Sequence, residues 1–528
     1  MDILLLQIKP QIGNLKNNFQ IIQHYYIRSL ELGLDLCVLP ELFTTGYIPG
    51  DLLLRSSFIK DLEYQIQQLL PITSSTTLLL PSPMIIRKKL YNGVYALQNG
   101  KIIAKTTKFH LPNYGIFDER RYFEQGQASI IKINRNIIGV LICEDMWFDD
   151  VVNKLKNDGA QLLIVINASP YWKGKPQQRL EIIKDRFDQT KLPIIYCNQV
   201  LGHDGIIYDG GSMVYDGVTN HTFNHCQEDI VKISVNTTTA IIDKVDKIQS
   251  FHPYITFRPT CIEEELYQAI ILGLKDYMQD NEFTTILLGL SGGIDSALSC
   301  HIAADAVGAK NVYAVMMPFY GITSNESIED ATNLAHSLNV NYKIISINEA
   351  VDSILNQVNI TFNITHQNLQ SRARGLTLMT IANDDNHLLL TTGNKSELAV
   401  GYTTIYGDMC GGFNLIKDLY KTDVMNLAKF LKIPQNIISK EPSPELSTNQ
   451  KDSDNLPKYE ILDKILYMYI EQNLGFNDII RRGFKKSEVE LVLKLVKSAE
   501  FKRKQSALGI KLSSRDLDKD WRYPITCN

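Results

Sequence analysis

The sequence lacks a large excess of charge of either sign, and it lacks long apolar runs. Its 528 residues carry 54 Lys and Arg against 58 Asp and Glu, a formal net charge of −4, so no basic surface of the extent that binds nucleic acid is indicated. No run approaches the roughly 18 apolar residues that a membrane-spanning helix needs. We therefore expect neither a nucleic acid nor a membrane as a partner.

Paired cysteines and a leader-like N-terminus are also missing. The eight cysteines are scattered and form no C-x-x-C pair, which argues against a zinc site and against a disulfide framework. Residues 1–8 lack a basic segment and turn polar at once, so they predict a first strand and not a signal peptide. These features favour a reducing, cytoplasmic location.

The composition that is present is that of a folded protein with more than one domain. Hydrophobic residues make up 44% and charged residues 21%, which is ordinary for globular proteins, and the length predicts about two to four domains. Residues 247–260 contain Pro253 and Pro259 and show no helical or strand period, which is typical of an ordered connector. We place the boundary there and expect domains at 1–250 and 251–528.

The first half alternates short apolar runs with longer amphipathic ones, a pattern that predicts a layered α/β architecture. Asn99-Gly100 separates two apolar runs and is typical of a type I′ hairpin, so the sheet should be mixed. The expected strands are 3–8, 34–40, 76–82, 137–143, 161–167 and 193–199, and the expected helices are 14–33, 56–70, 149–158 and 175–190.

The second half shows a βαβαβ series, which predicts a Rossmann-like parallel sheet. Helices are expected at 262–280, near 325–338 and beyond 458, and strands at 284–290, 312–317 and 342–347.

Three residues of the first half stand where α/β proteins carry chemistry. Cys143 and Glu41 each follow an apolar strand, and Lys108 lies in a loop after the predicted hairpin. Because ligands are met at the carboxyl ends of strands, a thiol there is placed to act as a nucleophile. Taken alone, a cysteine is more often a small core residue, and each charged residue is more often solvated.

The segments PELFTTGY, KFHLPNYGIFDERRYF and LICEDMW together resemble the nitrilase, or carbon–nitrogen hydrolase, superfamily over about residues 1–250. The resemblance implies an αββα sandwich that hydrolyses a carboxamide. Cys143 would be the nucleophile, Glu41 the general base and Lys108 the group that stabilises the oxyanion. Glu119 either orients Lys108 or only caps its loop or forms a salt bridge there.

The same resemblance implies that L-glutamine is the amide substrate, bound by Tyr114, Ser169 and Lys175. Lys173 lies in the same loop as Lys175 and competes with it for this role.

A glycine turn in the second half suits a pyrophosphate group. Ser291-Gly292-Gly293-Ile294-Asp295-Ser296 follows an apolar strand and opens a helix, so it offers backbone amides and two hydroxyls to an anion. It lacks the Gly-Lys-[Ser/Thr] ending of a Walker loop. It resembles the pyrophosphate loop of N-type ATP pyrophosphatases, which implies adenylation of a substrate oxygen with release of pyrophosphate.

The ordered set Thr392-Gly393-Asn394-Lys395-Ser396-Glu397 and Tyr406-Gly407-Asp408 resembles the NAD synthetases. Joined to the nitrilase-like half, it makes nearly the whole chain resemble the glutamine-dependent NAD synthetase family, glutamine-hydrolysing ligases of the last step of NAD biosynthesis. The resemblance implies that ATP activates deamido-NAD, that ammonia from glutamine passes between the domains, and that the chain forms a homo-oligomer. The implied ligands are Gly289, Leu290, Ser291, Gly292, Gly293, Ile294, Asp295, Ser296 and Thr392 for ATP; Asn368, Glu397 and Lys502 for deamido-NAD; and Asp295 and Glu397 for Mg²⁺.

Several points stay open from sequence. Lys421 and Ser443 are candidates for further ATP contacts, whereas Arg372, Arg374 and Asp408 fit substrate contacts and structural ion pairs equally well. The turn at 317–324 departs from the family pattern. A GMP-synthetase-like amidotransferase and a nucleotide-binding scaffold with degenerate sites are the alternative functions.

Overall fold

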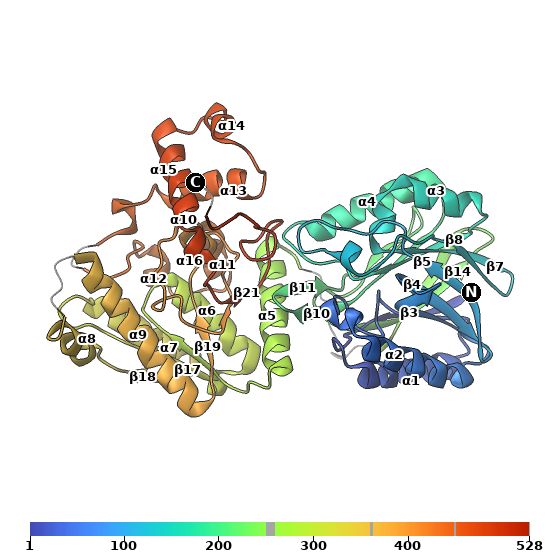
Figure 1. Cartoon of the computed structure of the whole chain (residues 1–528), viewed down its shortest axis with the longest axis horizontal. Coiled ribbons are helices and arrows are strands. Elements are labelled where there is room, and N and C mark those ends of the chain that lie inside the picture. The colour runs from blue at the N-terminus through green and yellow to red at the C-terminus, as the bar shows by residue number, and fades with distance from the viewer. Residues whose placement is uncertain (250–258, 359–362, 448–449, 527–528) are drawn as a thin grey trace. The chain divides into compact units, whose positions relative to one another are not determined.

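The computed structural model describes residues 1–249, 259–358, 363–447 and 450–526. The chain divides into two compact units (Figure 1). One contains Met1–Leu201 and Tyr208–Thr260, and the other contains Gly202–Ile207 and Cys261–Asn528. The hairpin strands β10 (Val200–His203) and β11 (Ile206–Asp209) are therefore divided between the two units.

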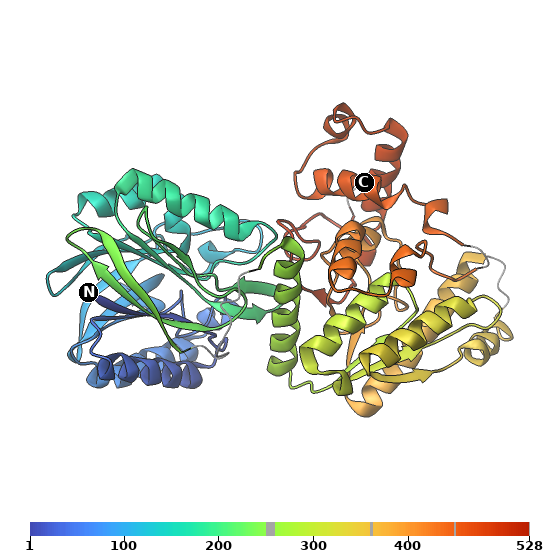
Figure 2. The same ribbon diagram turned by 180° about the vertical axis from the view of Figure 1, so that it is seen from behind.

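The first unit contains two β-sheets with helices on their outer faces, as Figures 1 and 2 show. Their strand orders are β15-β14-β1-β2-β3-β4-β5 and β13-β12-β9-β8-β7-β6. The strands are β1 (Asp2–Gln7), β2 (Leu36–Val38), β3 (Thr77–Ile86), β4 (Lys89–Gln98), β5 (Lys101–Thr107), β6 (Ile130–Ile133), β7 (Asn136–Ile142), β8 (Leu162–Asn167), β9 (Ile194–Asn198), β12 (Met213–Tyr215), β13 (Asn220–Thr222), β14 (Asp229–Asn236) and β15 (Ile241–Gln249).

Three apolar clusters hold these layers together. Alternate strand residues such as Leu5 and Val140 fill the space between the two sheets. Helices α1 (Leu15–Glu31) and α2 (Ser56–Leu69) pack on the outside of the first sheet, and α3 (Asp149–Asn157) and α4 (Lys175–Thr190) pack on the second. The expected αββα sandwich is confirmed.

The structure confirms the hairpin and corrects the connector. Asn99 and Gly100 have φ of 50° and 72° and join β4 to β5, as a type I′ turn requires. The first sheet is mixed, because β1 and β2 pair in parallel and β3 and β4 antiparallel. The sequence predicts no strand in 247–260, but residues 247–249 form the end of β15. The prediction is wrong for these residues, because pairing with β14 satisfies their backbone groups. Residues 250–258 lie outside the described part.

The second unit is built on an all-parallel sheet of order β18-β17-β16-β19-β20-β21. Because β16 to β18 run outward in one direction and β19 to β21 in the other, the order reverses between β16 and β19. In such sheets ligands bind beyond the carboxyl ends of the strands at this point. The strands are β16 (Ile286–Gly289), β17 (Val312–Met316), β18 (Asn341–Ile344), β19 (Leu388–Thr391), β20 (Phe413–Asn414) and β21 (Leu508–Gly509).

Helices flank this sheet and make up most of the C-terminal region. The expected Rossmann-like arrangement is confirmed, and the helices at 262–280 and 325–338 match their predicted bounds. The helices are α5 (Ile262–Asp280), α6 (Ile294–Val307), α7 (Asn325–Leu338), α8 (Asn348–Leu355), α9 (Asn363–Asp385), α10 (Lys395–Val400), α11 (Lys421–Phe430), α12 (Gln435–Ser439), α13 (Tyr459–Ile470), α14 (Phe476–Arg481), α15 (Lys486–Ser498) and α16 (Glu500–Arg503).

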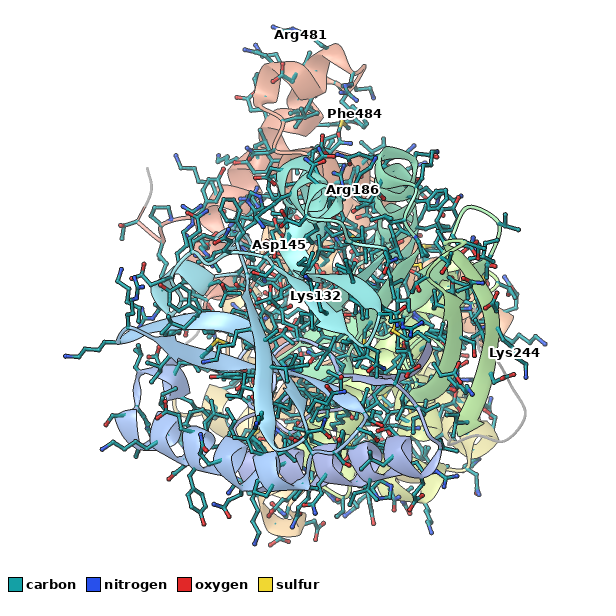
Figure 3. All side chains as sticks on the ribbon, turned by 90° about the vertical axis from the view of Figure 1, so that its right-hand side faces the viewer. Lys132, Asp145, Arg186, Lys244, Arg481 and Phe484 are labelled. Carbon is teal, nitrogen blue, oxygen red and sulfur yellow. The ribbon has the colours of Figure 1, made fainter. Side chains whose placement is uncertain are left out.

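Figure 3 shows how charged side chains are distributed. Lys244 on β15 and Arg481 on α14 extend from the surface, whereas Asp145 lies inside the first unit. No helix in the described ranges is long and apolar enough to cross a membrane.

Candidate active sites

The structure brings Glu41, Lys108 and Glu119 into one buried cluster. Lys108 Nζ donates hydrogen bonds of 2.7 Å to Glu41 Oε1 and of 2.7 Å to Glu119 Oε1. Burial alone would lower the pKa of Lys108, but the charges of Glu119 and Glu41 raise it well above its ordinary value. The lysine is therefore a fixed cation, and the position of Glu119 favours the orienting role over the loop-capping one.

Glu41 is held by three groups from different parts of the first unit. Besides the lysine, Asn92 Nδ2 donates to its Oε1 at 2.7 Å and the Ala168 amide donates to its Oε2 at 3.0 Å. The carboxylate is fully buried, so these contacts fix its orientation. A carboxylate held in this way can exchange a proton with a neighbour without swinging away.

Cys143 begins the short 3₁₀ turn Cys143–Trp147 directly after β7. Its φ of 47° is unusual for a side-chain-bearing residue, and strained conformations of this kind gather at functional sites. Burial raises the pKa of its thiol well above the ordinary value, the charge of Glu41 adds to this, and the charge of Lys108 opposes it. The thiol is therefore protonated at rest and needs a base to act as a nucleophile.

Asp145 ties this turn to the loop that carries Lys108. Its Oδ1 accepts hydrogen bonds from the amides of Phe109 and His110 at 3.1 and 2.8 Å, and its Oδ2 accepts one from the Ile142 amide at 3.3 Å. Burial raises the pKa of Asp145 to about 6. This residue therefore positions the nucleophile and the lysine relative to each other.

Tyr114 and Glu144 face each other beside the nucleophile. The Tyr114 hydroxyl donates to the two Glu144 carboxylate oxygens at 2.9 and 3.0 Å, and burial together with Glu144 raises the pKa of Tyr114. Glu144 was not among the predicted residues. Its position directly after Cys143 was the only sequence signal for it.

Ser169 lies buried two residues after the end of β8, where Arg179 of α4 holds it. Arg179 Nε donates to Ser169 Oγ at 3.1 Å and Nη2 donates to Ser169 O at 2.8 Å. Arg179 Nη1 also pairs with both oxygens of Asp209 at 2.7 and 2.9 Å. Sequence reasoning missed this Arg179–Asp209 pair, because its members are 30 residues apart.

Lys175 is the first residue of α4 and is 7% exposed, whereas Lys173 is exposed. Its Nζ lies 3.9 Å from the ring centroid of Trp147 and 4.0 Å from that of Trp172. Burial, aided by the charge of Arg179, lowers the pKa of Lys175 to about 7, and the charges of Cys143 and Glu144 act in the opposite direction. These observations favour Lys175 over Lys173.

In the second unit the glycine turn after β16 packs against α7. Gly292 has φ of 81°, and a Cβ added there would come within 2.3 Å of the Ser327 carbonyl oxygen, so only glycine fits. Ser291 Oγ and Ser296 Oγ lie 3.1 Å apart, and α6 begins at Ile294. The loop thus presents two hydroxyls and a helix N-terminus, which favour an anion.

A cavity of about 640 Å³ opens at the carboxyl ends of β16 and β19, where the strand order predicts a ligand. It brings together every predicted ATP, deamido-NAD and metal residue except Gly292, together with Lys421 and Ser443. The predicted residues that line it are Gly289, Leu290, Ser291, Gly293, Ile294, Asp295, Ser296, Asn368, Thr392, Glu397 and Lys502.

Asp295 and Glu397 converge on one ammonium group at this cavity. Lys421 Nζ pairs with Asp295 Oδ2 and lies 3.4 Å from Glu397 Oε1, and Asn394 Nδ2 donates to Asp295 Oδ1 at 3.0 Å. Burial raises the pKa of Glu397 to about 8. No group of three or more potential metal-ligating side chains occurs among the described residues, so these two carboxylates would share a Mg²⁺ ion with phosphate oxygens and water, which is usual for this ion.

The remaining candidates differ in their surroundings. Lys502 Nζ donates to the carbonyls of Gly401 and Thr403, each at 2.7 Å, and lines the cavity. Arg374 also lines it and donates to Met317 O at 3.0 Å, whereas Arg372 is exposed and donates to Ile405 O at 3.2 Å. Asp408 lines the cavity and accepts from the Thr404 amide at 2.6 Å. Arg374 and Asp408 therefore stay candidates for substrate contacts, whereas Arg372 does not line the cavity.

The turn that departs from the family pattern is closed by its own residues. The amides of Ile322 and Thr323 donate to Phe319 O at 3.1 and 3.0 Å, and Phe319 N donates to Thr323 Oγ1 at 3.1 Å. Thr323 lines the cavity.

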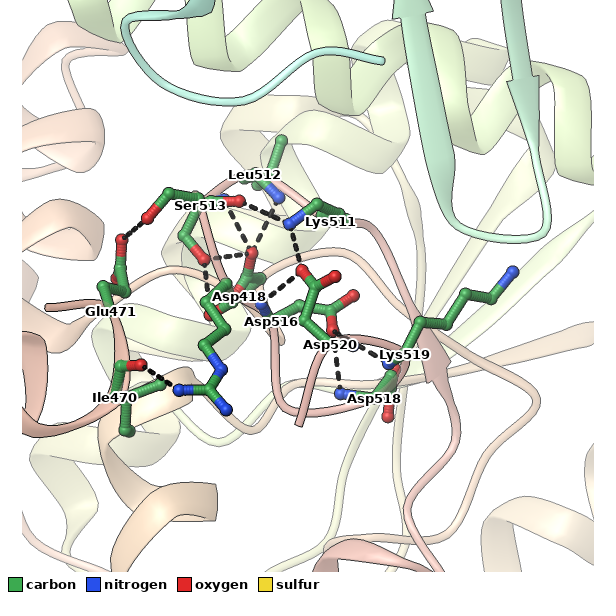
Figure 4. Close-up of polar contacts among 12 residues, drawn as sticks. Asp418, Ile470, Glu471, Lys511, Leu512, Ser513, Asp516, Asp518, Lys519 and Asp520 are labelled. Atoms are coloured by element: carbon green, nitrogen blue, oxygen red, sulfur yellow. Dashed lines mark hydrogen bonds and ion pairs between the residues drawn. The ribbon is translucent and has the colours of Figure 1, made fainter. Parts of the chain in front are cut away.

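Lys395, at the centre of the T-G-N-K-S-E motif, turns away from the cavity toward the C-terminal segment. Its Nζ pairs with Asp418 and Glu471 at 2.9 and 3.1 Å, and it donates to Ser513 Oγ and Arg515 O at 2.6 and 2.9 Å. Figure 4 shows the contacts that continue from Asp418, which also accepts hydrogen bonds from the amides of Leu512 and Ser513, each within 2.8 Å. The sequence did not predict that Lys395 would contact the C-terminal segment.

Together the two units define a glutamine amidohydrolase of the nitrilase type in one chain with a pyrophosphate-loop ligase. Two family models match the chain, "Carbon-nitrogen hydrolase" over residues 5–220 and "NAD synthase" over residues 266–506. The chain is 39% identical to the glutamine-dependent NAD(+) synthetase of Acinetobacter baylyi, with 99% of this chain and 98% of that protein covered. It is 37% identical to the enzyme of the same name from Thermotoga maritima, with 100% and 98% covered.

A solved structure is similar to this chain over nearly its whole length. The glutamine-dependent NAD+ synthetase from Acinetobacter baumannii, in complex with ADP, is 37% identical, has a TM-score of 0.77, and is matched over 99% of this chain and 98% of its own. This chain belongs to the glutamine-dependent NAD(+) synthetase family, the glutamine-hydrolysing ligases that form NAD. The alternatives of a GMP-synthetase-like enzyme and of a degenerate scaffold are therefore set aside.

Proposed function

We propose that the first unit releases ammonia from L-glutamine at Cys143 and that the second unit uses it to amidate deamido-NAD at the cavity beside the pyrophosphate loop. The observation that carries this proposal is the pair of chemically complementary sites in one chain. One site has a buried thiol with a fixed carboxylate and ammonium, and the other has a cavity lined by an anion-binding loop.

In the glutaminase reaction, Glu41 takes the proton of the Cys143 thiol while the sulfur attacks the carboxamide carbon of glutamine. Lys108 stabilises the negative oxygen of the tetrahedral intermediate. When the intermediate collapses, the proton on Glu41 goes to the departing ammonia and a thioester remains. Glu41 then takes a proton from the water that attacks the thioester carbon. When this second intermediate collapses, the C–S bond breaks, glutamate leaves, and the proton on Glu41 returns to the Cys143 sulfur.

Glutamine itself is a zwitterion, so its site needs both charges. We assign its carboxylate to Lys175 and Ser169, since the ammonium and hydroxyl are suitable donors. We assign its ammonium to the Tyr114–Glu144 pair, whose carboxylate supplies the acceptor.

In the ligase reaction, the nicotinate carboxylate of deamido-NAD attacks the α-phosphorus of ATP, and pyrophosphate leaves toward the loop at 289–296. Ammonia then attacks the acyl carbon of the adenylate, and AMP leaves. Lys421 and Lys502 supply positive charge near the phosphates, while Asn368 contacts the dinucleotide. Asp295 and Glu397 would hold Mg²⁺, which when bound supplies positive charge to the phosphate oxygens.

A passage between the units is part of the proposal, because ammonia released into water near neutral pH is mostly protonated and ammonium is no nucleophile. We also retain the expectation of a cytoplasmic homo-oligomer. A reducing compartment keeps the Cys143 thiol available for attack.

Conversion of deamido-NAD by the purified protein tests the proposal. Wild type should form NAD with either glutamine or ammonium chloride, whereas Cys143→Ala should lose the glutamine-supported reaction and keep most of the ammonia-supported one. If the variant loses both reactions while its circular dichroism spectrum is unchanged, the division of labour between the units is wrong.

A further inference from the structure

A buried ammonium group beside the nucleophile lacks the partners that buried lysines usually have. No carboxylate of the described residues pairs with Lys175 within ion-pair distance, although the side chain is 7% exposed. Buried charges are normally paired. The position at the first residue of α4 adds a further cost, because a helix N-terminus disfavours a cation.

The nearby carboxylates are already engaged by other groups. Glu144 accepts the Tyr114 hydroxyl, and Asp209 holds Arg179 through two hydrogen bonds. Lys175 therefore has charge and hydrogen-bond donors available for an anion that enters the site. An ammonium group offers three donors and no acceptor.

Two indole rings take the place of a counter-ion. Trp147 and Trp172 lie with their ring centroids 3.9 and 4.0 Å from Lys175 Nζ, well inside the distance at which an aromatic face attracts a cation. An indole face stabilises the charge without accepting a conventional hydrogen bond. It therefore keeps the ammonium positioned while leaving its donors free.

Trp147, Trp172 and the Lys175 ammonium together form what we call the cage, and backbone contacts fix all three residues. Arg186 Nη2 donates to Trp147 O at 3.0 Å, and the Lys175 amide donates to Trp172 O at 2.8 Å. Gly174, with φ of 87°, makes the turn between Trp172 and Lys175. The cage is thus built from the turn that carries the nucleophile and from the start of α4.

We propose that Trp147 and Trp172 are positioning residues that hold the Lys175 ammonium as the anchor for the carboxylate of glutamine, and so determine the affinity of the glutaminase site. This inference rests on the proposed function. It adds to that function a reason why the site prefers an amide that carries an α-carboxylate.

The cage also predicts how glutamine use depends on pH. A carboxylate binds protonated Lys175, and the pKa of this group is lowered to about 7 by burial and by Arg179, against the opposing charges of Cys143, Glu144 and Asp209. Glutamine kcat/KM should therefore fall as pH rises above the pKa of Lys175. Removal of an indole face should shift this fall to lower pH, because the cation loses part of its stabilisation.

Trp172 is the better residue to change, since Trp147 shares its turn with Cys143. Trp172→Leu should raise KM for glutamine at least tenfold and change kcat less than threefold, whereas Trp172→Phe, which keeps an aromatic face, should stay within threefold of wild type in KM. Lys173→Met is the matched control at the neighbouring exposed lysine and should leave both constants unchanged.

A double-mutant cycle separates the cage from simple packing. In a Lys175→Met background, Trp172→Leu should have no further effect on KM. An unchanged KM in Trp172→Leu, or an equal rise in both backgrounds, would overturn the cage. Failure of wild type to form NAD from glutamine would instead overturn the function on which the cage rests.

Discussion

Glu119→Gln tests whether Lys108 must be held from both sides. Lys108 Nζ lies 2.7 Å from Glu41 Oε1 and 2.7 Å from Glu119 Oε1, and the substitution removes the charge of the second contact while keeping its shape. A hydrogen bond to a charged group contributes about 1.5–3 kcal/mol. If Lys108 is then misoriented and loses the equivalent of one such hydrogen bond to the oxyanion of the tetrahedral intermediate, kcat for glutamine hydrolysis falls about 10- to 150-fold.

The fold should tolerate this change. The new amide side chain keeps an oxygen that can accept the Tyr47 hydroxyl, which donates to Glu119 Oε1 at 2.6 Å in the wild type, and the cluster of two carboxylates and one ammonium becomes neutral. One amide nitrogen is left without an acceptor, which costs about 1–3 kcal/mol. A melting temperature within several degrees of wild type is therefore expected.

The assay is glutamate release from glutamine, measured beside ammonia-supported NAD formation in the same preparation. Glu124→Gln is the matched control, because Glu124 lies in the same loop and pairs with Lys89 at 3.1 Å with both side chains about half exposed. Exposed pairs of this kind contribute little. A wild-type kcat for glutamine in Glu119→Gln would refute the orienting role of Glu119.

Two further predictions concern the second unit. Asp295→Asn should stop NAD formation from glutamine and from ammonia while sparing glutamate release, because it removes one of the two cavity carboxylates that we assign to Mg²⁺; retained synthesis would remove Asp295 from the metal-binding role. Lys395→Met leaves Asp418 and Glu471 buried without their cation and should destabilise the second unit by about 3–5 kcal/mol. Urea unfolding followed by the fluorescence of Trp521 in a Trp147→Phe/Trp172→Phe background would measure this, and an unchanged midpoint would contradict it.

Local pattern predicted most of the fold. Helix α4 begins at Lys175 and ends at Thr190 as expected, because an amphipathic run follows a glycine turn. The all-parallel order of the second sheet followed from the βαβαβ series. Pattern failed at β15, where residues 247–249 are in a strand through pairing with β14 and not through their own periodicity.

Local sequence pattern also predicted part of the two candidate sites. Cys143 and the loop at 289–296 stand at strand ends, and that position can be read from an apolar run followed by a turn. The partners that hold these residues come from distant segments, as Asp209 does for Arg179 and Asn92 for Glu41. A single sequence carries no signal for such pairs, because they depend on how the elements pack.

The contrast between Lys395 and Lys421 shows why a motif alone does not assign a ligand. Both are buried lysines between carboxylates. The partners of Lys421 line the cavity, so a phosphate oxygen that enters can compete for its charge. The partners of Lys395 are Asp418, Glu471, Ser513 and Arg515, and none of them lines the cavity. Lys395 therefore joins the T-G-N-K-S-E motif to Ser513 and Arg515 near the end of the chain, and it is a structural contact and not a ligand of the cavity.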